Sequence, residues 1–220
     1  KAMIPLKDKS ILEHISDTYR NHGINKIHVV RGYKKESINF PELNYIDNDD
    51  HETTSELSSF HKAIDQISGD IVCSFGDVLF KPYLLQLLDE CEDDLVIVID
   101  TQWKDSVNKD RAADYVNCSQ PHSRANYGDS IFLESAGENL GEDSIHGEWM
   151  GIIKISSAIF PTVRKEVESL SKLENFDSMK MHHLLEHLCR LKQPIRVVYT
   201  TGNWLDVDTL EDVIRANNFL

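Results

Sequence analysis

Three aspartates of this chain have the side-chain type and the local setting to bind a hard cation. Asp206 and Asp208 are separated by one residue, and side chains at i and i+2 of an extended segment point to the same face. Asp77 closes the apolar run of residues 71–76. Magnesium prefers oxygen ligands, and when few carboxylates and several waters hold it, it usually serves phosphate chemistry. If Asp77 reaches the same point from another strand end, the sequence predicts a magnesium site.

The two neighbouring aspartates are not equivalent. Asp208 stands three residues before Glu211, and this spacing favours a capping box at the start of the last helix. Asp206 instead interrupts an apolar Trp-Leu-x-Val segment, where an unpaired carboxylate is unfavourable. We therefore expect Asp77 and Asp206 to be the principal metal ligands, with Asp208 as a helix cap that faces the same site.

A second candidate lies between two glycines in His146-Gly147-Glu148-Trp149-Met150-Gly151. One interpretation is a turn that enters a strand, with Trp149 in the core. The other is a pocket wall, where Glu148 and the Trp149 ring bind a cationic or hydroxylated group. Trp103 and Asp114 could add to such a wall. The spacing leaves both interpretations open.

Basic residues gather in the polar segment 101–145: Lys104, Lys109, Arg111 and Arg124. They form either a solvated face or the positive charge that a phosphate or phosphonate needs. His183 and His187, four residues apart, could bind a transition metal, but the leucines around them favour an ordinary amphipathic helix. The sequence contains no G-x-S-x-G, G-x-G-x-x-G or G-x-x-x-x-G-K-[ST] motif.

Composition narrows the class of protein. The 220 residues are 40% hydrophobic, which suits one globular domain, and no apolar run approaches the roughly 20 residues of a membrane span. The net charge of −14 disfavours nucleic-acid binding and repels small anions at long range. Local cations would have to overcome that field. Four widely spaced cysteines predict reduced thiols and a cytoplasmic protein.

The elements that must position these residues alternate along the chain. Capping boxes predict helix starts at Ser10 and Thr53, and Pro82 opens a third helix. Strands are predicted at 26–30, 43–46, 70–75 and 95–99. This order predicts an α/β fold with a doubly wound, mostly parallel sheet, whose ligands lie beyond the carboxyl ends of the strands.

The rest of the chain contains a different pattern. Residues 101–145 predict an inserted β-rich lobe over the site, with strands at 114–118 and 130–133. A strand at 148–155 returns to the main sheet. The elements expected after it are helices at 157–170 and 178–191, strands at 195–199 and 204–207, and a last helix that begins at Asp208 or Thr209. We expect a single domain over residues 1–220.

The motifs, in their order, resemble those of nucleotidyltransferases that activate sugar phosphates and phosphocholine. Residues 1–6, 10–14 and 29–34 are similar to the start of that family, and residues 52–57 to its segment before the next helix. Phe75-Gly76-Asp77 and Trp204-Leu205-Asp206 resemble its two magnesium-binding aspartates. The resemblance implies a Rossmann-like (GT-A-like) fold and magnesium-dependent nucleotidyl transfer. The family has a glycine-rich loop before the lysine that matches Lys1, so we expect the chain to be N-terminally incomplete.

A narrower resemblance rests on residues 108–116, 146–151 and 202–208. These segments are similar to the cytidylyltransferase domain fused to phosphoenolpyruvate mutase in phosphonate biosynthesis. The resemblance implies that CTP and 2-aminoethylphosphonate or 2-hydroxyethylphosphonate give a CMP-phosphonate and pyrophosphate. It also implies a phosphoenolpyruvate mutase domain as a fusion or partner. The oligomeric state stays open, and a homo-oligomer is compatible with the sequence.

The resemblance implies a role for each candidate residue. Magnesium would bind Asp77, Asp206 and Asp208, and Lys1 would stabilise phosphate charge. The nucleotide would contact Gly32, Tyr33, Thr54, Ser55 and Gly76, and the acceptor would contact Arg111, Asp114, Glu148 and Trp149. Two alternatives remain: a phosphocholine or sugar-1-phosphate nucleotidyltransferase, and a non-catalytic nucleotide-binding or regulatory module of the same fold.

Overall fold

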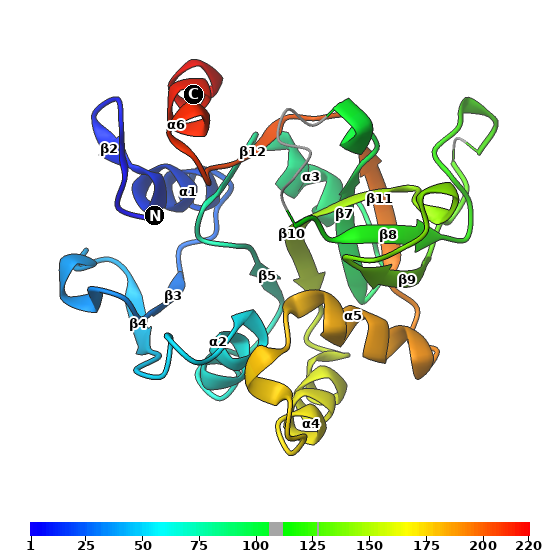
Figure 1. Ribbon diagram of the computed structural model, residues 1–220, viewed down its shortest axis with the longest axis horizontal. Helices are drawn as coiled ribbons and strands as arrows, with labels where there is room; N and C mark the ends of the chain where they lie inside the picture. The colour runs from blue at the N-terminus through cyan, green and yellow to red at the C-terminus, as the bar shows by residue number, and fades with distance from the viewer. Residues whose placement is uncertain (106–111, 127) are drawn as a thin grey trace.

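The structure, a computed structural model, describes residues 1–105, 112–126 and 128–220. A six-stranded sheet forms the larger part, and three two-stranded sheets accompany it (Figure 1). The strands of the large sheet are β5 (Ile71–Cys73), β7 (Leu95–Asp100), β8 (Tyr115–Cys118), β9 (Leu133–Gly137), β10 (Gly147–Ile155) and β11 (Arg196–Thr200). The short sheets pair β1 (Pro5–Leu6) with β2 (Lys9–Ser10), β3 (His28–Arg31) with β4 (Asn44–Asp47), and β6 (Val78–Phe80) with β12 (Trp204–Asp206).

The α/β fold class is confirmed, and the large sheet is mixed rather than mostly parallel. The long strand β10 runs antiparallel to β7 along one edge and to β5 and β8 along the other. Strands β7 and β11 are paired in parallel, as are β3 and β4. Strands β5, β7, β8 and β11 therefore share one direction, and the inserted β10 makes most pairings antiparallel.

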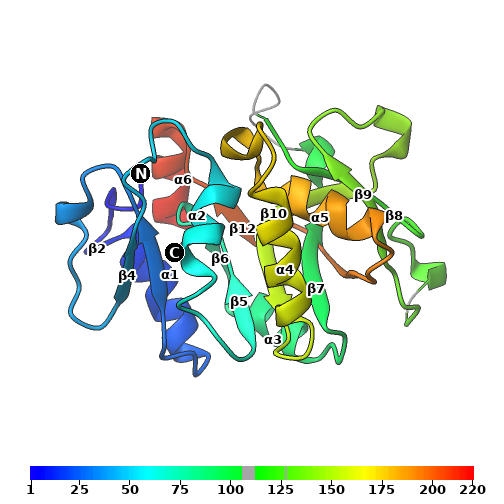
Figure 2. The ribbon, with the colours of Figure 1, turned by 90° about the horizontal axis from the view of Figure 1, so that it is seen from below.

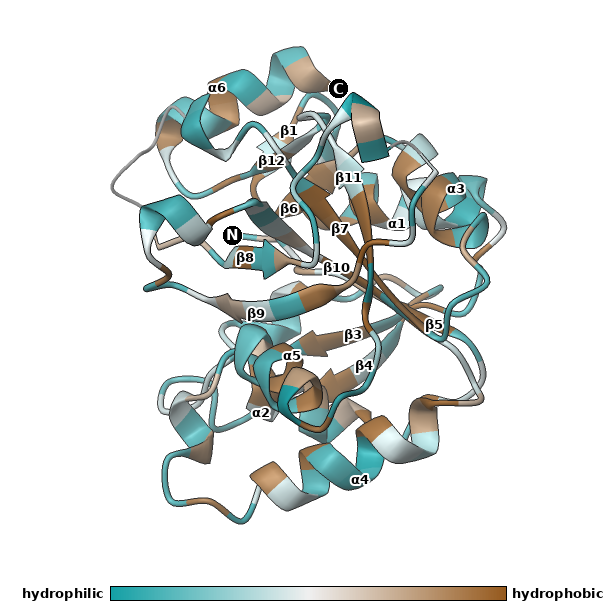
Figure 3. Ribbon diagram, turned by 90° about the vertical axis from the view of Figure 1, so that its right-hand side faces the viewer, coloured by the Kyte–Doolittle hydropathy of each residue, from teal (hydrophilic) through white to brown (hydrophobic). Residues whose placement is uncertain are grey.

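Six helices cover the two faces of the sheet among the described residues (Figure 2). They are α1 (Ile11–Asn21), α2 (Glu56–Ala63), α3 (Tyr83–Asp89), α4 (Phe160–Leu170), α5 (Met181–Arg190) and α6 (Leu210–Phe219). Helices α2, α4 and α5 contribute to one hydrophobic cluster, and α1, α3 and α6 to another. Figure 3 shows the apolar strands β7 and β10 between these groups.

Strand β7 is covered on both faces, which explains why its sequence is apolar throughout. Leu95, Ile97 and Ile99 face the first cluster, while Val96 and Val98 face the second. Successive side chains of a strand point to opposite faces, so a strand covered on both faces needs an apolar residue at every position. All five residues are at most 1% exposed.

One of the expected helix starts is wrong, and the structure selects one of the two starts expected for the last helix. The capping box of Ser10 and Glu13 is confirmed. Helix α2 begins after Ser55 rather than Thr53, because the Glu56 carboxylate accepts a hydrogen bond from the Met181 backbone at 3.1 Å instead of closing a local box. The last helix has Thr209 as its N-cap, with Asp212 at the third position. Asp208 is therefore not the cap.

Two further differences concern strands. Strand β6 was not predicted from the sequence, and its three residues are all buried. Strand β8 lies where a strand was predicted at 114–118, whereas β9 begins where the predicted strand at 130–133 ends. Strand β8 pairs with β10 and β9 pairs with β8, so both extend the large sheet. Within the described residues, no helix combines the length and the apolar character required to cross a membrane.

Candidate active site

The three aspartates singled out in the sequence meet at the pairing of β6 with β12. Asp206 lies opposite Val78, so β12 places it beside Asp77, which precedes β6. The Val207 backbone donates to the Asp77 carbonyl at 3.1 Å and holds the two segments together. One carboxylate oxygen from each of Asp77, Asp206 and Asp208 lies within 4.8 Å of the others. This all-oxygen set fits a hard divalent cation.

Asp208 can join this cluster because its neighbours cap the helix. Thr209 and Asp212 bond reciprocally in the capping box, and Asp212 also accepts from the Asp208 backbone at 3.3 Å. Burial alone would raise the Asp212 pKa, but these hydrogen bonds and the nearby Arg215 lower it overall. The Asp208 carboxylate is left for the cluster.

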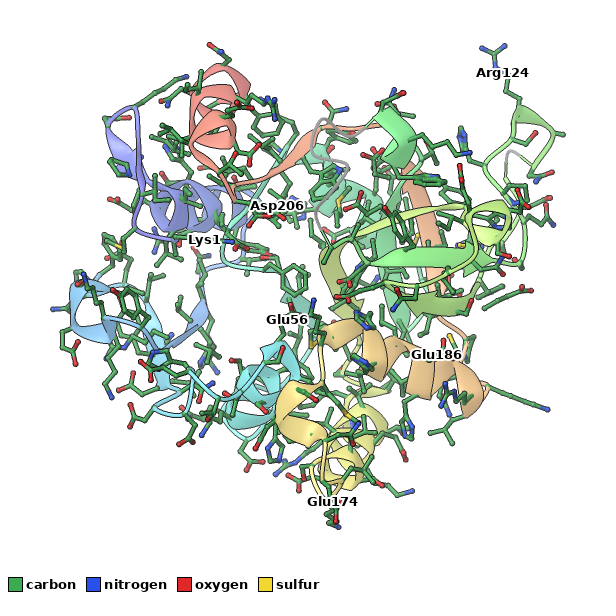
Figure 4. All side chains as sticks on the ribbon, viewed as in Figure 1. Lys1, Glu56, Arg124, Glu174, Glu186 and Asp206 are labelled. Carbon is green, nitrogen blue, oxygen red and sulfur yellow. The ribbon has the colours of Figure 1, made fainter. Side chains whose placement is uncertain are left out.

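Lys1 places a positive charge against the same carboxylates. Its ammonium group donates to Asp208 and lies 3.5 Å from Asp77 Oδ2. Partial burial opposes the charged form, yet the hydrogen bond to Asp208 and the three aspartate charges together raise the Lys1 pKa. Lys1 is therefore a cation at neutral pH. Figure 4 shows Lys1 and Asp206 beside one another.

A cavity of about 450 Å³ joins this cluster to a second group of charged residues. The aspartate cluster, Lys1 and Gly76 line part of it. The second group consists of Glu56, Asp114, Glu148 and Lys180, with Trp149 beside them. Glu56 lies apart from Lys1 and Asp206 in Figure 4. The cavity thus carries charge at two separate places.

The second group is mostly buried. Glu148 is 3% exposed, and burial raises the pKa of Glu56 despite the hydrogen bond from Met181. Asp114 is bonded to the His182 ring at 2.7 Å. Removing carboxylates from water is unfavourable unless partners compensate. Met181 and His182 supply such partners to Glu56 and Asp114.

The interpretation of Trp149 as a core residue is confirmed, and its contact with a ligand stays a prediction. It is 2% exposed, its indole N–H donates to the Ile152 carbonyl at 2.9 Å, and its ring packs edge-on against Phe75. It also lines the cavity. Trp149 is therefore a core residue that also borders the cavity.

Gly151 shapes strand β10 close to Glu148 and Trp149. Its φ is +79°, and an added Cβ would lie 2.2 Å from the Phe75 ring. The register of β10 against β7 shifts between Trp149 and Ile153. A β-bulge of this kind redirects side chains near a site.

The four residues expected to bind nucleotide before Gly76 lie around the loop that precedes α2. Tyr33 is 68% exposed, and its ring lies 6.3 Å from that of His51. Thr54 donates to the Asp50 carbonyl and accepts from Asn48, and Ser55 is the α2 N-cap. Gly32 packs against His51. None of the four is among the described residues lining the cavity, so their role stays a prediction.

The basic residues singled out in segment 101–145 differ in where the structure places them. Lys109 and Arg111 lie outside the described residues. Lys104 is near Glu142 and over the Trp103 ring, and Trp103 itself packs on Tyr115. Figure 4 shows Arg124 far from Lys1 and Asp206. The described cation at the second group is Lys180, which the sequence did not single out.

Long-range contacts explain the residues that sequence reasoning missed. Glu56 was expected only as a helix-capping residue, while Lys180 and His182 received no role. His183 accepts from the Lys180 backbone and His187 pairs with Glu166, so they have separate partners. A Lys-x-His pattern at the start of a helix does not by itself indicate a functional site, so Lys180 and His182 could not be recognised from the sequence.

Comparison with known proteins agrees with this geometry. The chain is 24% identical to CTP:phosphoglutamine cytidylyltransferase of Campylobacter jejuni, over 97% of this chain and 89% of the relative. Over the whole length of this chain, the identity to the bifunctional protein GlmU of Methanocaldococcus jannaschii is 23%. The chain spans about half of that relative (49%). No model of a protein family matches the chain.

Solved structures share the fold. The inositol-1-phosphate CTP transferase of T. maritima superposes with a TM-score of 0.75 at 14% identity, covering 100% of this chain and 85% of the other. The CTP:phosphocholine cytidylyltransferase of Streptococcus pneumoniae gives 0.68 at 11% identity, covering 99% and 88%. The chain is thus similar in sequence to a cytidylyltransferase over nearly its whole length, and it shares the fold of solved cytidylyltransferases.

Proposed function

We propose that this chain is a cytidylyltransferase that transfers CMP from CTP to a phosphonate and releases pyrophosphate. The observation that carries the proposal is the single cavity lined by both the aspartate cluster with Lys1 and the buried acidic group. The first group suits phosphates and their metal ion, and the second suits the far end of a small acceptor. The cytidylyltransferases among the relatives support CTP as the donor.

The reaction needs positioning and charge stabilisation rather than a covalent enzyme intermediate. A phosphonate oxygen attacks the α-phosphorus of CTP, and the bond from that phosphorus to the bridging oxygen of pyrophosphate breaks. Lys1 lies where its ammonium group could neutralise phosphate oxygens. Asp77, Asp206 and Asp208 would hold magnesium, which supplies Lewis-acid stabilisation of phosphate charge when bound.

The acidic group favours an acceptor with a cationic end. Three carboxylates, Glu56, Asp114 and Glu148, line this part of the cavity with Lys180 as the described counter-charge. An ammonium group would meet the carboxylates and the Trp149 ring, whereas a hydroxyl group would gain only hydrogen bonds. We therefore favour 2-aminoethylphosphonate over 2-hydroxyethylphosphonate. The partnership with phosphoenolpyruvate mutase rests on the sequence resemblance alone.

Phosphocholine is the second candidate acceptor. Its quaternary ammonium group also suits a buried carboxylate and an aromatic ring, and Glu148 and Trp149 both line the cavity. A sugar 1-phosphate has no cationic end and fits the acidic group less well.

A pyrophosphate-release assay tests the proposal. The enzyme with magnesium is given CTP, UTP, GTP or dTTP, each with 2-aminoethylphosphonate, 2-hydroxyethylphosphonate, phosphocholine or a sugar 1-phosphate. We expect turnover with CTP and the aminophosphonate. Turnover only with a sugar phosphate would contradict the acceptor, and no turnover with any pair would contradict the enzymatic function.

The Asp206→Asn variant tests the proposed metal ligands in the same assay. Losing one charge-stabilising group typically lowers kcat by about 100-fold or more, so we expect a loss of that size. Asp65→Asn is the matched control, because Asp65 is exposed and pairs with Arg164 on α4. An Asp206→Asn rate near that of the control would show that Asp206 is not a metal ligand.

A further inference from the structure

The start of α5 contacts carboxylates of the second group of charged residues in the cavity. Three successive residues each hold a different carboxylate: Lys180 with Glu138, Met181 through its backbone N–H with Glu56, and His182 with Asp114. Two of these carboxylates, Glu56 and Asp114, line the cavity. The start of α5 therefore fixes two of the carboxylates at the end of the cavity that we assign to the acceptor.

His182 has the geometry to fix one carboxylate. Its Nδ1 lies 2.7 Å from Asp114 Oδ1, and the two side chains are 7% and 12% exposed. Its ring stacks on His183 with centroids 4.1 Å apart and an interplanar angle of 30°. Packing on one side and a charge-assisted hydrogen bond on the other restrict both the imidazole and the carboxylate. That bond occupies one Asp114 oxygen and leaves the other for a ligand.

We propose that His182 is a positioning residue that orients Asp114 toward the cationic end of the acceptor. The inference rests on the proposed function and adds to it a residue that does not line the cavity itself. His182 is absent from the described lining residues, whereas Asp114 is among them. Outer groups that fix the direction of a contacting side chain commonly decide how well a site works.

The test compares two substitutions of His182. His182→Leu removes the donor, while His182→Asn places an amide N–H close to the position of Nδ1. Steady-state kinetics are measured with CTP and either 2-aminoethylphosphonate or 2-hydroxyethylphosphonate. We expect His182→Leu to raise the KM for the amino acceptor about ten-fold. The KM for CTP and for the hydroxyl acceptor should change less than about two-fold, and His182→Asn should restore most of the loss.

His187→Leu is the matched control, because His187 lies on the same helix but pairs with Glu166. It should leave the ratio of the two acceptor KM values unchanged. An equal effect of His182→Leu on both acceptors would overturn the proposal. So would a His182→Asn variant that melts like wild type and is as impaired as His182→Leu.

A double-mutant cycle keeps the proposal testable if His182→Leu does not fold. His182→Ala, which also removes the donor, is combined with Asp114→Asn, and the KM for the amino acceptor is measured for both single variants and the pair. If His182 acts through Asp114, it has no further effect once Asp114 is replaced; additive effects would overturn the proposal. Wild-type enzyme that turns over no acceptor would refute the proposed function itself, whereas turnover with an unchanged acceptor ratio refutes only the role of His182.

Discussion

Lys1 lies against the carboxylates that we propose as ligands of a divalent cation. The Lys1 ammonium group donates to Asp208 and lies 3.5 Å from Asp77 Oδ2, within the cluster that Asp206 completes. A metal ion bound to these oxygens would lie close to a like charge. We therefore predict that Lys1→Gln binds a divalent cation more tightly than wild type in the absence of nucleotide, although our proposal gives Lys1 a role in the reaction.

The size of the effect follows from distance and exposure. The Lys1 side chain is 48% exposed, and those of Asp77 and Asp208 are 30% and 32% exposed, so a water-like dielectric applies. Two unit charges about 4 Å apart then interact by about 1 kcal/mol, and a divalent ion doubles this value. Because Lys1 can move away as the metal binds, this is an upper limit. We expect the dissociation constant to fall by about 3- to 30-fold.

Manganese binding followed by electron paramagnetic resonance measures this constant without any turnover. Lys9→Gln serves as the matched control, because Lys9 pairs with Asp17 on α1, and it should bind manganese like wild type. Unchanged or weaker binding by Lys1→Gln would refute the competition. Asp206→Asn in the same titration should weaken binding and so identify the site that is being measured.

The remaining predictions concern stability. Burial raises the pKa of Glu56 above its unfolded value, so native protein holds the proton more tightly, and this stabilisation is lost as pH rises through the raised pKa. Glu56→Gln should gain stability relative to wild type over that range, measured by urea unfolding from pH 4 to 8, and a constant difference would contradict this cause. Gly151→Ala should destabilise by about 2–4 kcal/mol, since positive φ and the Phe75 contact add; an unchanged urea midpoint would contradict the clash. Thr209→Ala should lose about 1 kcal/mol with its cap, whereas Asp208→Ala should lose less in the same experiment.

Elements whose signal lies within a few neighbouring residues could be predicted from the sequence. The apolar run of β7 and the box of Ser10 and Glu13 have local causes, namely coverage on both faces and reciprocal hydrogen bonds. Asp77 and Asp206 were also recognisable, because each is a carboxylate next to an apolar strand. The i, i+2 spacing of Asp206 and Asp208 correctly indicated one site, although the competing role assigned to Asp208 belongs to Thr209.

Features that depend on distant partners could not be predicted in this way. Glu56 had the local pattern of a capping residue, but its hydrogen-bond donor is Met181, 125 positions away. Asp114 meets His182 across 68 positions. The antiparallel insertion of β10 follows from pairing across the whole sheet. In each case the local pattern allows several partners, and tertiary packing selects one.

The charges of the cavity give a physical reason for a substrate with two different ends. Among the described residues that line it, six are acidic and two are lysines, in a chain of net charge −14. An anion approaching such a protein is repelled at long range, so phosphate groups bind only where local cations reverse the sign. Lys1 and a metal ion can do so at the aspartate cluster. At the second group, Lys180 is already paired with Glu138, and the carboxylates that face the cavity there favour a cation. The proposed acceptor, a phosphonate with an ammonium end, would therefore match both parts of the cavity in one orientation, whereas a doubly anionic acceptor would match only one.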